Sequence, residues 1–498
     1  MRTHPSRRWL ARVRTLALVV AMPGSLPAQV PAPAVASLGA PGTFDFNPTT
    51  PEVVLSTDGQ LVAGVNGPPQ QFFDGLFQFR NVTIGPGVTV RGVGSHPMIW
   101  VVDNFTLDGT LSVTGGWGGR FSTNGTTPPG GVGGPAAGRG GDTHPQIAFA
   151  GTAGNGPGNT PGTGGGGGFL LGQSLGPGSG GGGGAFGTIG DPFYKVLAGP
   201  GTSFVQQLGI GGFGGTGPSG AATRTLPGGG PGGWLFVDGE PDNDFFGFGF
   251  DVNAQRFVRG ELPFLVGGSG GGAGGDASVI GPFATLGQDL RGGAGGGGGG
   301  CLVIVATNDI TIGNTGGIQA DGGNGAAGEL ALPSLAPSAG GGGGGSGGLV
   351  ILAAHHLLVI NVKGETYANN DFRFAVSADG GACQMTQPKY PNTASAIPAT
   401  YGASYDVLPA GGFGGLGIIE LVTRPGTNNA DGTNTVLDDN IQLLQNGQPL
   451  TGATKQRFLA WRGWRNAQGI PVDDFGAPTN IGSNEGDLRP CPVLLPWL

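Results

Sequence analysis

The chain has 498 residues, of which 112 are glycine and 40 are proline, so these two types make up about 30% of it. Without a Gly-X-Y register, this composition excludes a collagen triple helix. The formal net charge of −8 at pH 7 argues against binding to nucleic acid or anionic lipid. The apolar residues are concentrated in strand-length blocks, which indicates a folded chain rather than a disordered one.

Residues 1–36 have the features of a secretory signal peptide and its cleavage region. A basic start is followed by the apolar run 15–22 (TLALVVAM) and by small residues suited to cleavage between about Ala28 and Ala36. Cleavage leaves 18 basic and 31 acidic residues, a net charge of −13. No later apolar run reaches the ~20 residues of a membrane span. We therefore expect a secreted or cell-surface protein with no integral membrane span and no nucleic-acid partner.

The three cysteines, Cys301, Cys383 and Cys491, are an odd number for an exported chain. Cys301 begins an apolar strand and is expected to be a small buried hydrophobic residue. Cys383 and Cys491 either form a disulfide or remain two free thiols, and the sequence does not decide between these alternatives. Three cysteines can form at most one disulfide within the chain, which is too few to stabilise a fold of this size. We therefore expect its stability to come from interactions other than disulfides.

The first half of the mature chain changes character several times. Residues 37–76 mix turns with short apolar pieces and are expected to form an N-terminal cap. From Phe77 the strands become regular. A glycine-rich tract follows over residues 116–235, and residues 236–265 form an insertion that is richer in aromatic and acidic side chains.

Three later stretches repeat one pattern, in which a polar pair separates two apolar segments. The pairs are Asp103-Asn104, Asn308-Asp309 and His355-His356. A polar pair at the same place in each repeat predicts a corner where the chain turns from one sheet face to the next. In residues 301–306 and 349–354 both alternating sets are apolar, which is typical of parallel strands covered on both faces. We expect the adjoining glycine tracts to cover the outer face.

The sequence therefore predicts an all-β fold, in which residues 77–425 form a parallel β-solenoid with β-helix-like rungs and long glycine-rich excursions. Polyglycine can adopt a polyproline-II-like form, but its N–H groups must bond to one another or to water. The excursions must therefore pack cooperatively or remain mobile, and we expect partial packing. Residues 426–498 are expected to form a small C-terminal cap, with a helix or strand pair at 453–465, because the last rung would otherwise expose an edge.

The repeat is seen most fully in residues 295–325, where glycine runs flank two strands and a polar corner. Over residues 77–425 this pattern resembles bacterial secreted glycine-rich repeat proteins. More distantly, it resembles the parallel β-helix passengers of surface adhesins. The resemblance implies a repeated extracellular scaffold and no active-site residue.

The strongest candidate for a ligand site is an acidic stretch in the insertion, formed by Asp238, Glu240, Asp242 and Asp244. Acids at every second position resemble the ligand spacing of calcium loops, so calcium is the cofactor that this stretch suggests. The glycine and the last glutamate of an EF-hand loop are not in register, and a solvated acidic turn is the alternative. The motif GGAGGD ending at Asp276 matches a calcium-binding repeat only once, as expected by chance in so glycine-rich a chain.

No set of residues forms a catalytic motif. The adjacent His355 and His356 would point to opposite faces of a strand and could not easily bind one ion. Glycoside cleavage requires two acids that converge on one groove. Acids on or near the rungs are Asp103, Asp309, Asp321 and Glu420. Their spacing forces no pairing, so turn and edge acids are the simpler interpretation.

These patterns favour a secreted or surface-displayed structural or adhesion protein without catalytic activity. Its expected partners are extracellular polysaccharide or cell-envelope components. The alternative is a polysaccharide-binding or polysaccharide-cleaving protein of the β-helix type, although the basic residues that a uronate-acting enzyme needs are scarce near the rungs (Arg80, Arg91 and Lys363). A third hypothesis, an ice- or surface-binding protein, requires a flat exposed face, against which the insert at 245–264 argues.

Overall fold

The computed structural model describes residues 40–65, 68–119, 127–144, 149–168, 178–185, 192–197, 205–209, 232–233, 245–251, 256–276, 290–330, 339–362, 375–381, 387–388, 411–412, 414–424, 439–451 and 493–496. Within these residues the fold is all-β and built mainly of parallel sheets, with one short 3-10 helix, η2 (Pro157–Asn159). The expected signal peptide, the disulfide candidates Cys383 and Cys491, and the expected helix or strand pair at 453–465 lie outside the described residues.

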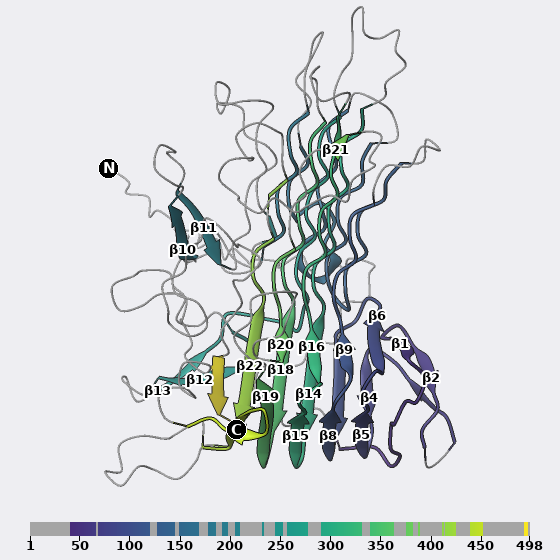
Figure 1. Cartoon of the computed structure of the whole chain (residues 1–498), viewed down its shortest axis with the longest axis vertical. Helices are drawn as coiled ribbons and strands as arrows, with labels where there is room; N and C mark the ends of the chain where they lie inside the picture. Colours follow the sequence, from purple (N-terminus) through teal and green to yellow (C-terminus); the bar gives the residue numbers. More distant parts are fainter. Residues whose placement is uncertain are drawn as a thin grey trace, which may run out of the picture.

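Three sheets of parallel strands form the base of the molecule (Figure 1). The first sheet runs in the order β25 (Val493–Pro496), β22 (Ile418–Thr423), β18 (Leu349–Ala354), β14 (Cys301–Ala306), β7 (Met98–Val102) and β4 (Leu76–Gln78). The second runs in the order β24 (Gln448–Pro449, antiparallel to its neighbour), β23 (Ile441–Gln445), β19 (Leu357–Val362), β15 (Asp309–Ile312), β8 (Asn104–Leu107) and β5 (Asn81–Ile84). The third runs in the order β1 (Glu52–Ser56), β6 (Thr89–Val93), β9 (Thr110–Ser112), β16 (Gly317–Gln319) and β20 (Val376–Ser377).

The remaining strands form small pairs outside these three sheets. They are β2 (Gln60–Val62) with β3 (Gln70–Phe72), β10 (Pro192–Leu197) with β11 (Val205–Gly209), β12 (Phe248–Asp251) with β13 (Arg256–Arg259), and β17 (Glu329–Leu330) with β21 (Gln387–Pro388). Only the last of these pairs is parallel; the other three are antiparallel.

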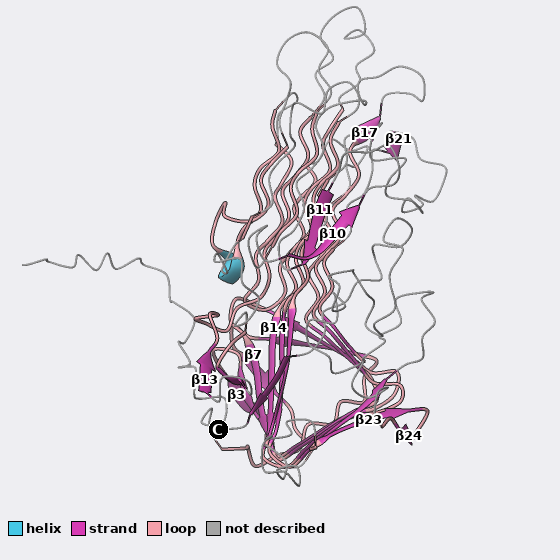
Figure 2. Ribbon diagram, turned by 90° about the vertical axis from the view of Figure 1, so that its left-hand side faces the viewer, coloured by secondary structure: helices cyan, strands magenta, loops and turns pink. Residues whose placement is uncertain are grey.

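The chain passes through the three sheets in turn, and each passage forms one layer. The strands β7, β8 and β9 form one layer, and β14, β15 and β16 form the next, in direct register with it. Figure 2 shows the three sheets as the sides of a triangle that encloses the core. Inward-facing residues therefore stack in columns, as Trp100, Ile304 and Leu352 do in the first sheet.

The predicted polar corners are confirmed. Asp103 separates β7 from β8, Thr307-Asn308 separates β14 from β15, and His355-His356 separates β18 from β19. Each pair thus lies where the chain turns from the first sheet into the second. The physical reason is that the polar pair must reach solvent while the apolar segments on either side are buried. Both conditions are met if the chain bends at the polar pair.

An aromatic cluster fills the N-terminal end of the triangular core. Its members are Phe44, Phe46, Phe72, Phe77, Phe79, Trp100 and Phe105. Ring centroids of neighbouring pairs lie 5.0–6.3 Å apart, and most pairs are tilted or edge-to-face, the arrangement that aromatic quadrupoles favour. The cluster closes the core where the first layers would otherwise expose their apolar interior.

The first sheet is buried on its outer face as well, as its fully apolar strands predicted. The residues that cover it correct the expectation, however. Ala136 comes from a glycine tract, but the larger side chains come from residues 245–266, namely Phe245, Phe246, Leu262, Leu265 and Val266. We call the described residues 245–251 and 256–266 the cover. Glycine has no side chain with which to bury a sheet face, so the apolar side chains of residues 245–266 supply most of the described side chains that cover this face.

The glycine tracts extend from one corner of the triangle. After β9, β16 and β20 the chain leaves the third sheet, and it re-enters the first sheet at β14, β18 and β22 through glycine-rich segments. In an earlier layer the same connection, between β6 and β7, takes only residues 94–97. Figure 1 shows the described segments rising side by side above the sheets. Together they form what we call the glycine bundle.

The bundle is held together by hydrogen bonds between backbones. Gly293, Gly296 and Gly299 donate N–H groups to carbonyls of one neighbour, residues 340–346. Other residues of the segment 293–300 donate to carbonyls of residues 113–116 and 138–141. Residues 131–134, 268–274 and 323–326 in turn donate N–H groups to carbonyls of the segment 293–300. The six neighbours are residues 113–116, 131–134, 138–141, 268–274, 323–326 and 340–346. A bonding period of three residues is that of a polyproline-II helix, and six neighbours correspond to hexagonal packing.

The lattice leaves no room for side chains at most of its glycines. A Cβ added at Gly296 or Gly345 would lie closer than 3.0 Å to backbone atoms of the adjacent segment. The expected cooperative packing of the glycine tracts is therefore confirmed for the described segments. Their N–H groups bond to one another, which offsets the entropy lost by ordering so much glycine.

Candidate functional site

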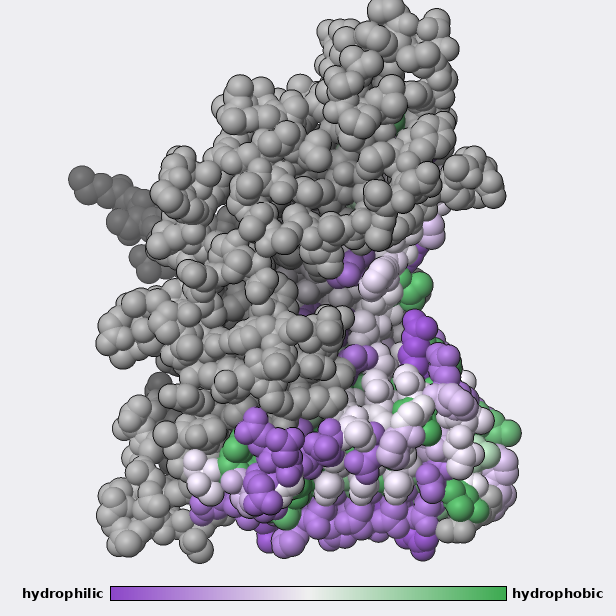
Figure 3. Space-filling model, viewed as in Figure 1, coloured by the Kyte–Doolittle hydropathy of each residue, from purple (hydrophilic) through white to green (hydrophobic). Residues whose placement is uncertain are grey.

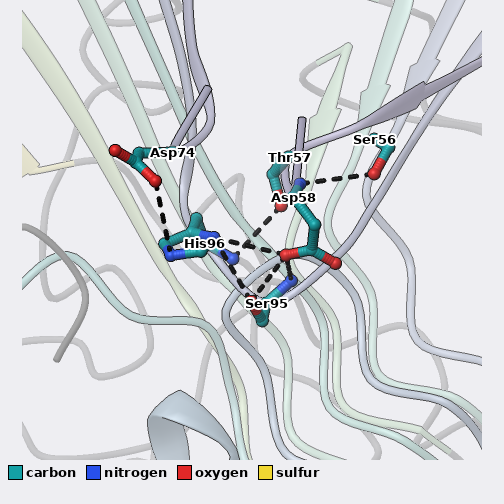
Figure 4. A network of polar contacts seen from close by, with 6 residues as sticks. All are labelled: Ser56, Thr57, Asp58, Asp74, Ser95 and His96. Carbon is teal, nitrogen blue, oxygen red and sulfur yellow. Dashed lines mark hydrogen bonds and ion pairs between the residues drawn. The ribbon is translucent and has the colours of Figure 1, made fainter. Parts of the chain in front are cut away.

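A cluster of Ser, His and Asp side chains lies at the corner between the third and first sheets, where β6 leads into β7. Asp58 Oδ1 accepts hydrogen bonds from the Ser95 backbone N–H at 2.7 Å and from the Ser95 hydroxyl at 2.5 Å. His96 Nδ1 lies 3.2 Å from the same oxygen, and His96 Nε2 lies 3.9 Å from Asp74 Oδ1 (Figure 4). Thr57 Oγ1 accepts from the His96 backbone N–H at 3.1 Å.

The residue types are those of a nucleophilic triad, but the geometry is not. A triad requires one ring nitrogen to face the hydroxyl and the other to face the acid. Here Ser95 Oγ and Asp58 Oδ1 both lie 3.2 Å from Nδ1 of His96. Because a carboxylate only accepts, the Ser95 hydroxyl donates to Asp58 and Nδ1 carries a proton. The cluster therefore has no base aimed at Ser95, and it acts as a clamp between two turns.

Backbone conformation brings the two turns of the clamp together. Gly94 has φ +125°, a region open to glycine, and a Cβ there would collide with Thr57 Oγ1. Sequence reasoning missed the clamp, since Asp58 and His96 are 38 residues apart. The sequence shows a Thr-Asp-Gly turn at 57–59 and a Gly-Ser-His-Pro corner at 94–97. Neither local pattern indicates that the two turns contact each other.

The clamp predicts a pH-dependent contribution to stability. Partial burial by itself would raise the pKa of Asp58, but hydrogen bonds from Ser95 and His96 lower it below 3.8. The stabilisation of the folded protein by ionised Asp58 is therefore present at neutral pH, and it is lost as the pH falls through this lowered pKa. We expect Asp58→Asn to lose about 1 kcal/mol at pH 7. Urea titrations should show that difference shrinking in acid, where both side chains are neutral; a difference that persists at pH 2 would contradict the prediction.

The four acids named as candidates for glycoside chemistry do not converge. Asp103 accepts from the Thr307 hydroxyl at 2.7 Å, and Asp309 lies 2.7 Å from His356 Nδ1, both at the corner between the first and second sheets. Asp321 lies in the glycine bundle, where its Oδ1 accepts from the backbone N–H of Asp379 at 2.9 Å. Glu420 is buried on the outer face of the first sheet. Each acid thus has a local structural partner, and they lie in three different parts of the molecule.

The corner between the first and second sheets carries a ladder of polar side chains. Arg80 forms a two-pronged ion pair with Asp45, at 2.9 and 2.6 Å. Asn81 donates to Asp45 at 2.9 Å, and Asn104 in the next layer donates to Asn81 at 3.0 Å. Figure 3 shows hydrophilic residues along this end of the molecule. The ladder satisfies polar groups of the corners, which is a structural role.

Further carboxylates cap the segments of the glycine bundle. Asp142 accepts from the N–H of Gly130 at 2.6 Å, and Asp276 accepts from that of Gly292 at 2.9 Å. Glu329 accepts from the N–H of Arg291 at 2.7 Å. The acid that completes the GGAGGD motif is thus used to cap a neighbouring segment. These acids bond the first N–H groups of segments whose ends would otherwise be unsatisfied.

The metal-binding hypothesis is not tested by these contacts. Asp238, Glu240, Asp242 and Asp244 lie outside the described residues. Among the residues that are described, no group of three or more His, Cys, Asp or Glu side chains could hold a metal ion. His356 Nδ1 lies 2.7 Å from Asp309 Oδ1 at its corner, as noted above.

Among the described titratable groups, Glu420 is buried in an apolar environment. It is 0% exposed, its Oε1 accepts the backbone N–H of Phe246 at 2.6 Å, and its Oε2 has no hydrogen-bond partner. Burial raises its pKa to about 8. Cys301 is a free thiol buried on the same sheet face, as its sequence context predicted, and burial also raises its pKa.

Comparison with known proteins adds no functional assignment. No protein-family model matches the chain, and neither the curated proteins nor the solved structures contain a significant match. In the described part of the chain, no helix has the length and apolar character needed to cross a membrane. The fold and the contacts of individual residues therefore carry the functional argument.

Proposed function

We propose that this chain is a secreted or cell-surface structural or adhesion protein without catalytic activity. In this proposal a short parallel β-solenoid, closed at its ends by caps, carries the glycine bundle as a rigid projection. The direct register between layers and the single corner from which the glycine segments leave support the solenoid description. The basic and apolar start of the sequence supports export.

The observation that carries the proposal is the six-neighbour lattice of the glycine bundle. Its described interior consists mostly of backbone, with small buried side chains such as Ser269 and Ser346 whose hydroxyl oxygens form hydrogen bonds within the bundle. At about 3.1 Å per residue, the segment 290–300 extends about 30 Å from the sheets. A stiff projection of this length suits a spacer or a surface that contacts extracellular polysaccharide or cell-envelope components.

The test is co-sedimentation of the mature protein with a panel of polysaccharides, with and without Ca²⁺, with the supernatants assayed for released oligosaccharides. We expect no released product from any polysaccharide. Binding without product supports adhesion, and neither binding nor product supports the scaffold role. Product that disappears in Asp309→Asn or Asp321→Asn would overturn the proposal in favour of a polysaccharide-cleaving enzyme. Ca²⁺-dependent binding that is lost in Asp242→Asn would support the acidic stretch as a calcium site.

Export is tested separately, by N-terminal sequencing of the protein recovered from its native cells. We expect a mature N-terminus between about Ala28 and Ala36, in an extracellular or envelope fraction. An intact Met1 on protein in the cytoplasmic fraction would contradict export without bearing on the catalytic question.

A further inference from the structure

We propose that the buried Glu420 carboxyl, which accepts the Phe246 N–H, is a pH-sensitive latch: while it is neutral the cover stays closed over the first sheet, and when it ionises the cover opens to let water reach the charge. The latch goes beyond the proposed function, because it gives one surface of the scaffold a conformational response. The cover consists of the described residues 245–251 and 256–266, and the sheet face beneath it includes β14, β18 and β22.

The position of Glu420 carries the argument. It lies in the middle of β22, in register with Ile351 on β18 and with Val493 on β25. Its neighbours at alternate positions, Ile418 and Val422, are buried in the apolar cluster that the cover completes. An acid at this position is buried only while the cover is in place.

The burial of Glu420 favours its protonated form. One oxygen accepts the Phe246 N–H, which by itself would favour the carboxylate, but the other is buried without a hydrogen-bond partner, and burial outweighs the single bond. The described side chains facing it across the cluster are apolar, apart from the buried thiol of Cys301 on β14. The charged residues of the cover are Asp251 and Arg256 at the ends of β12 and β13, Arg259, which is exposed, and Glu261, which is half-buried. No described contact supplies a cation to Glu420, so ionisation would leave a buried, unpaired charge.

The sign of the pH effect follows from the direction of the shift. The carboxyl has an ordinary pKa of 4.5 and a folded-state pKa of about 8. The folded protein therefore holds this proton more tightly than the unfolded chain, and stability falls as the pH rises from 4.5 toward 8. Above that range the closed state must carry the buried charge. Moving the cover gives the carboxylate access to water, so opening becomes the favoured response.

Cys301 reports on this opening because it lies in the same apolar cluster and is 0% exposed. The experiment treats the mature protein with iodoacetamide at pH values from 6 to 10, and follows the Cys301 peptide by mass spectrometry. Glu420→Gln keeps an oxygen acceptor for the Phe246 N–H but cannot ionise. Dividing the wild-type rate by the Glu420→Gln rate removes the ordinary effect of pH on thiol reactivity. The charge of an ionised Glu420 also raises the pKa of Cys301, which would lower this ratio, so a rise in the ratio reports opening.

We expect this ratio to be near one at pH 6 and to rise at least tenfold by pH 10. Glu261→Gln, which removes an acid from the cover itself, should behave like the wild type. A ratio that stays near one at every pH would overturn the latch. Wild-type labelling at pH 6 as fast as that of the urea-unfolded chain would also overturn it, since the cover would then already be open.

A second measurement keeps the proposal testable if Glu420→Gln does not fold. Hydrogen exchange of wild-type peptides that include Phe246 is followed over the same pH range and corrected for the intrinsic exchange rate. We expect protection of these peptides to fall at least tenfold above pH 8, while peptides from the inward-facing core, such as residues 350–354, keep theirs. Constant protection, or equal loss at both places, would contradict a local latch.

Discussion

Replacing Gly296 with alanine is expected to destabilise the protein by about 3 kcal/mol or more. The added Cβ would lie closer than 3.0 Å to Gly323 and Asn324 backbone atoms. A backbone neighbour cannot rotate away as a side chain can, so the lattice must separate or bend. Because Gly296 belongs to a segment bonded to six others, a local displacement lengthens several hydrogen bonds at once.

The matched control for this substitution is Gly85→Ala. Gly85 has nothing within 4 Å of its added Cβ and no left-handed backbone angle, so we expect a change within about 0.5 kcal/mol. The measurements are urea unfolding and hydrogen exchange of peptides from residues 290–300. Gly345→Ala, at a second position in the lattice, should repeat the effect of Gly296→Ala. Wild-type exchange in both lattice variants would show that the glycine segments are not held by direct backbone bonds.

The second large effect is expected at Trp100, where substitution by alanine should cost about 3–5 kcal/mol. Trp100 is the largest of the fully buried side chains, and its ring lies 5.6–6.3 Å from those of Phe46, Phe77, Phe79 and Phe105. Its removal leaves a cavity at the closed end of the core that the surrounding rings cannot fill without leaving their tilted contacts.

Trp117 provides the control, because the same residue type there is 65% exposed. We expect Trp117→Ala to change the free energy of unfolding by less than about 0.5 kcal/mol. Trp100→Phe should fall between the two, since it keeps a ring and removes a buried indole N–H that has no hydrogen-bond partner. Urea titrations of the three variants decide the order. Equal losses for Trp100→Ala and Trp117→Ala would contradict the described core.

The parts of the fold that could be predicted from sequence are those in which side chains form a local pattern. Doubly apolar strands such as β14 and β18 predicted burial on both faces, and the polar pairs between apolar segments predicted the corners. Burial of Cys301 followed from the same strand. Each of these inferences needed only neighbouring residues and the period of a strand.

The parts that could not be predicted depend on contacts between distant segments. A glycine run has no side-chain pattern, so nothing in it specifies that residues 290–300 lie beside 340–346 or 138–141. The expectation that glycine tracts would cover the first sheet was mostly wrong for the same reason, since burying a face requires apolar side chains such as Phe245 and Leu262. The Asp58 clamp and the Phe246 contact to Glu420 join residues 38 and 174 positions apart.

The sequence by itself thus determined the all-β class, the strands buried on both faces and the positions of the corners, because these follow from alternation of apolar and polar side chains along a few residues. Only the tertiary structure decided which segments neighbour one another in the glycine bundle, which residues cover the first sheet, and that Glu420 is buried without a charged partner in any described contact. Those outcomes depend on backbone hydrogen bonds and burial between segments far apart in the chain, which no local pattern encodes.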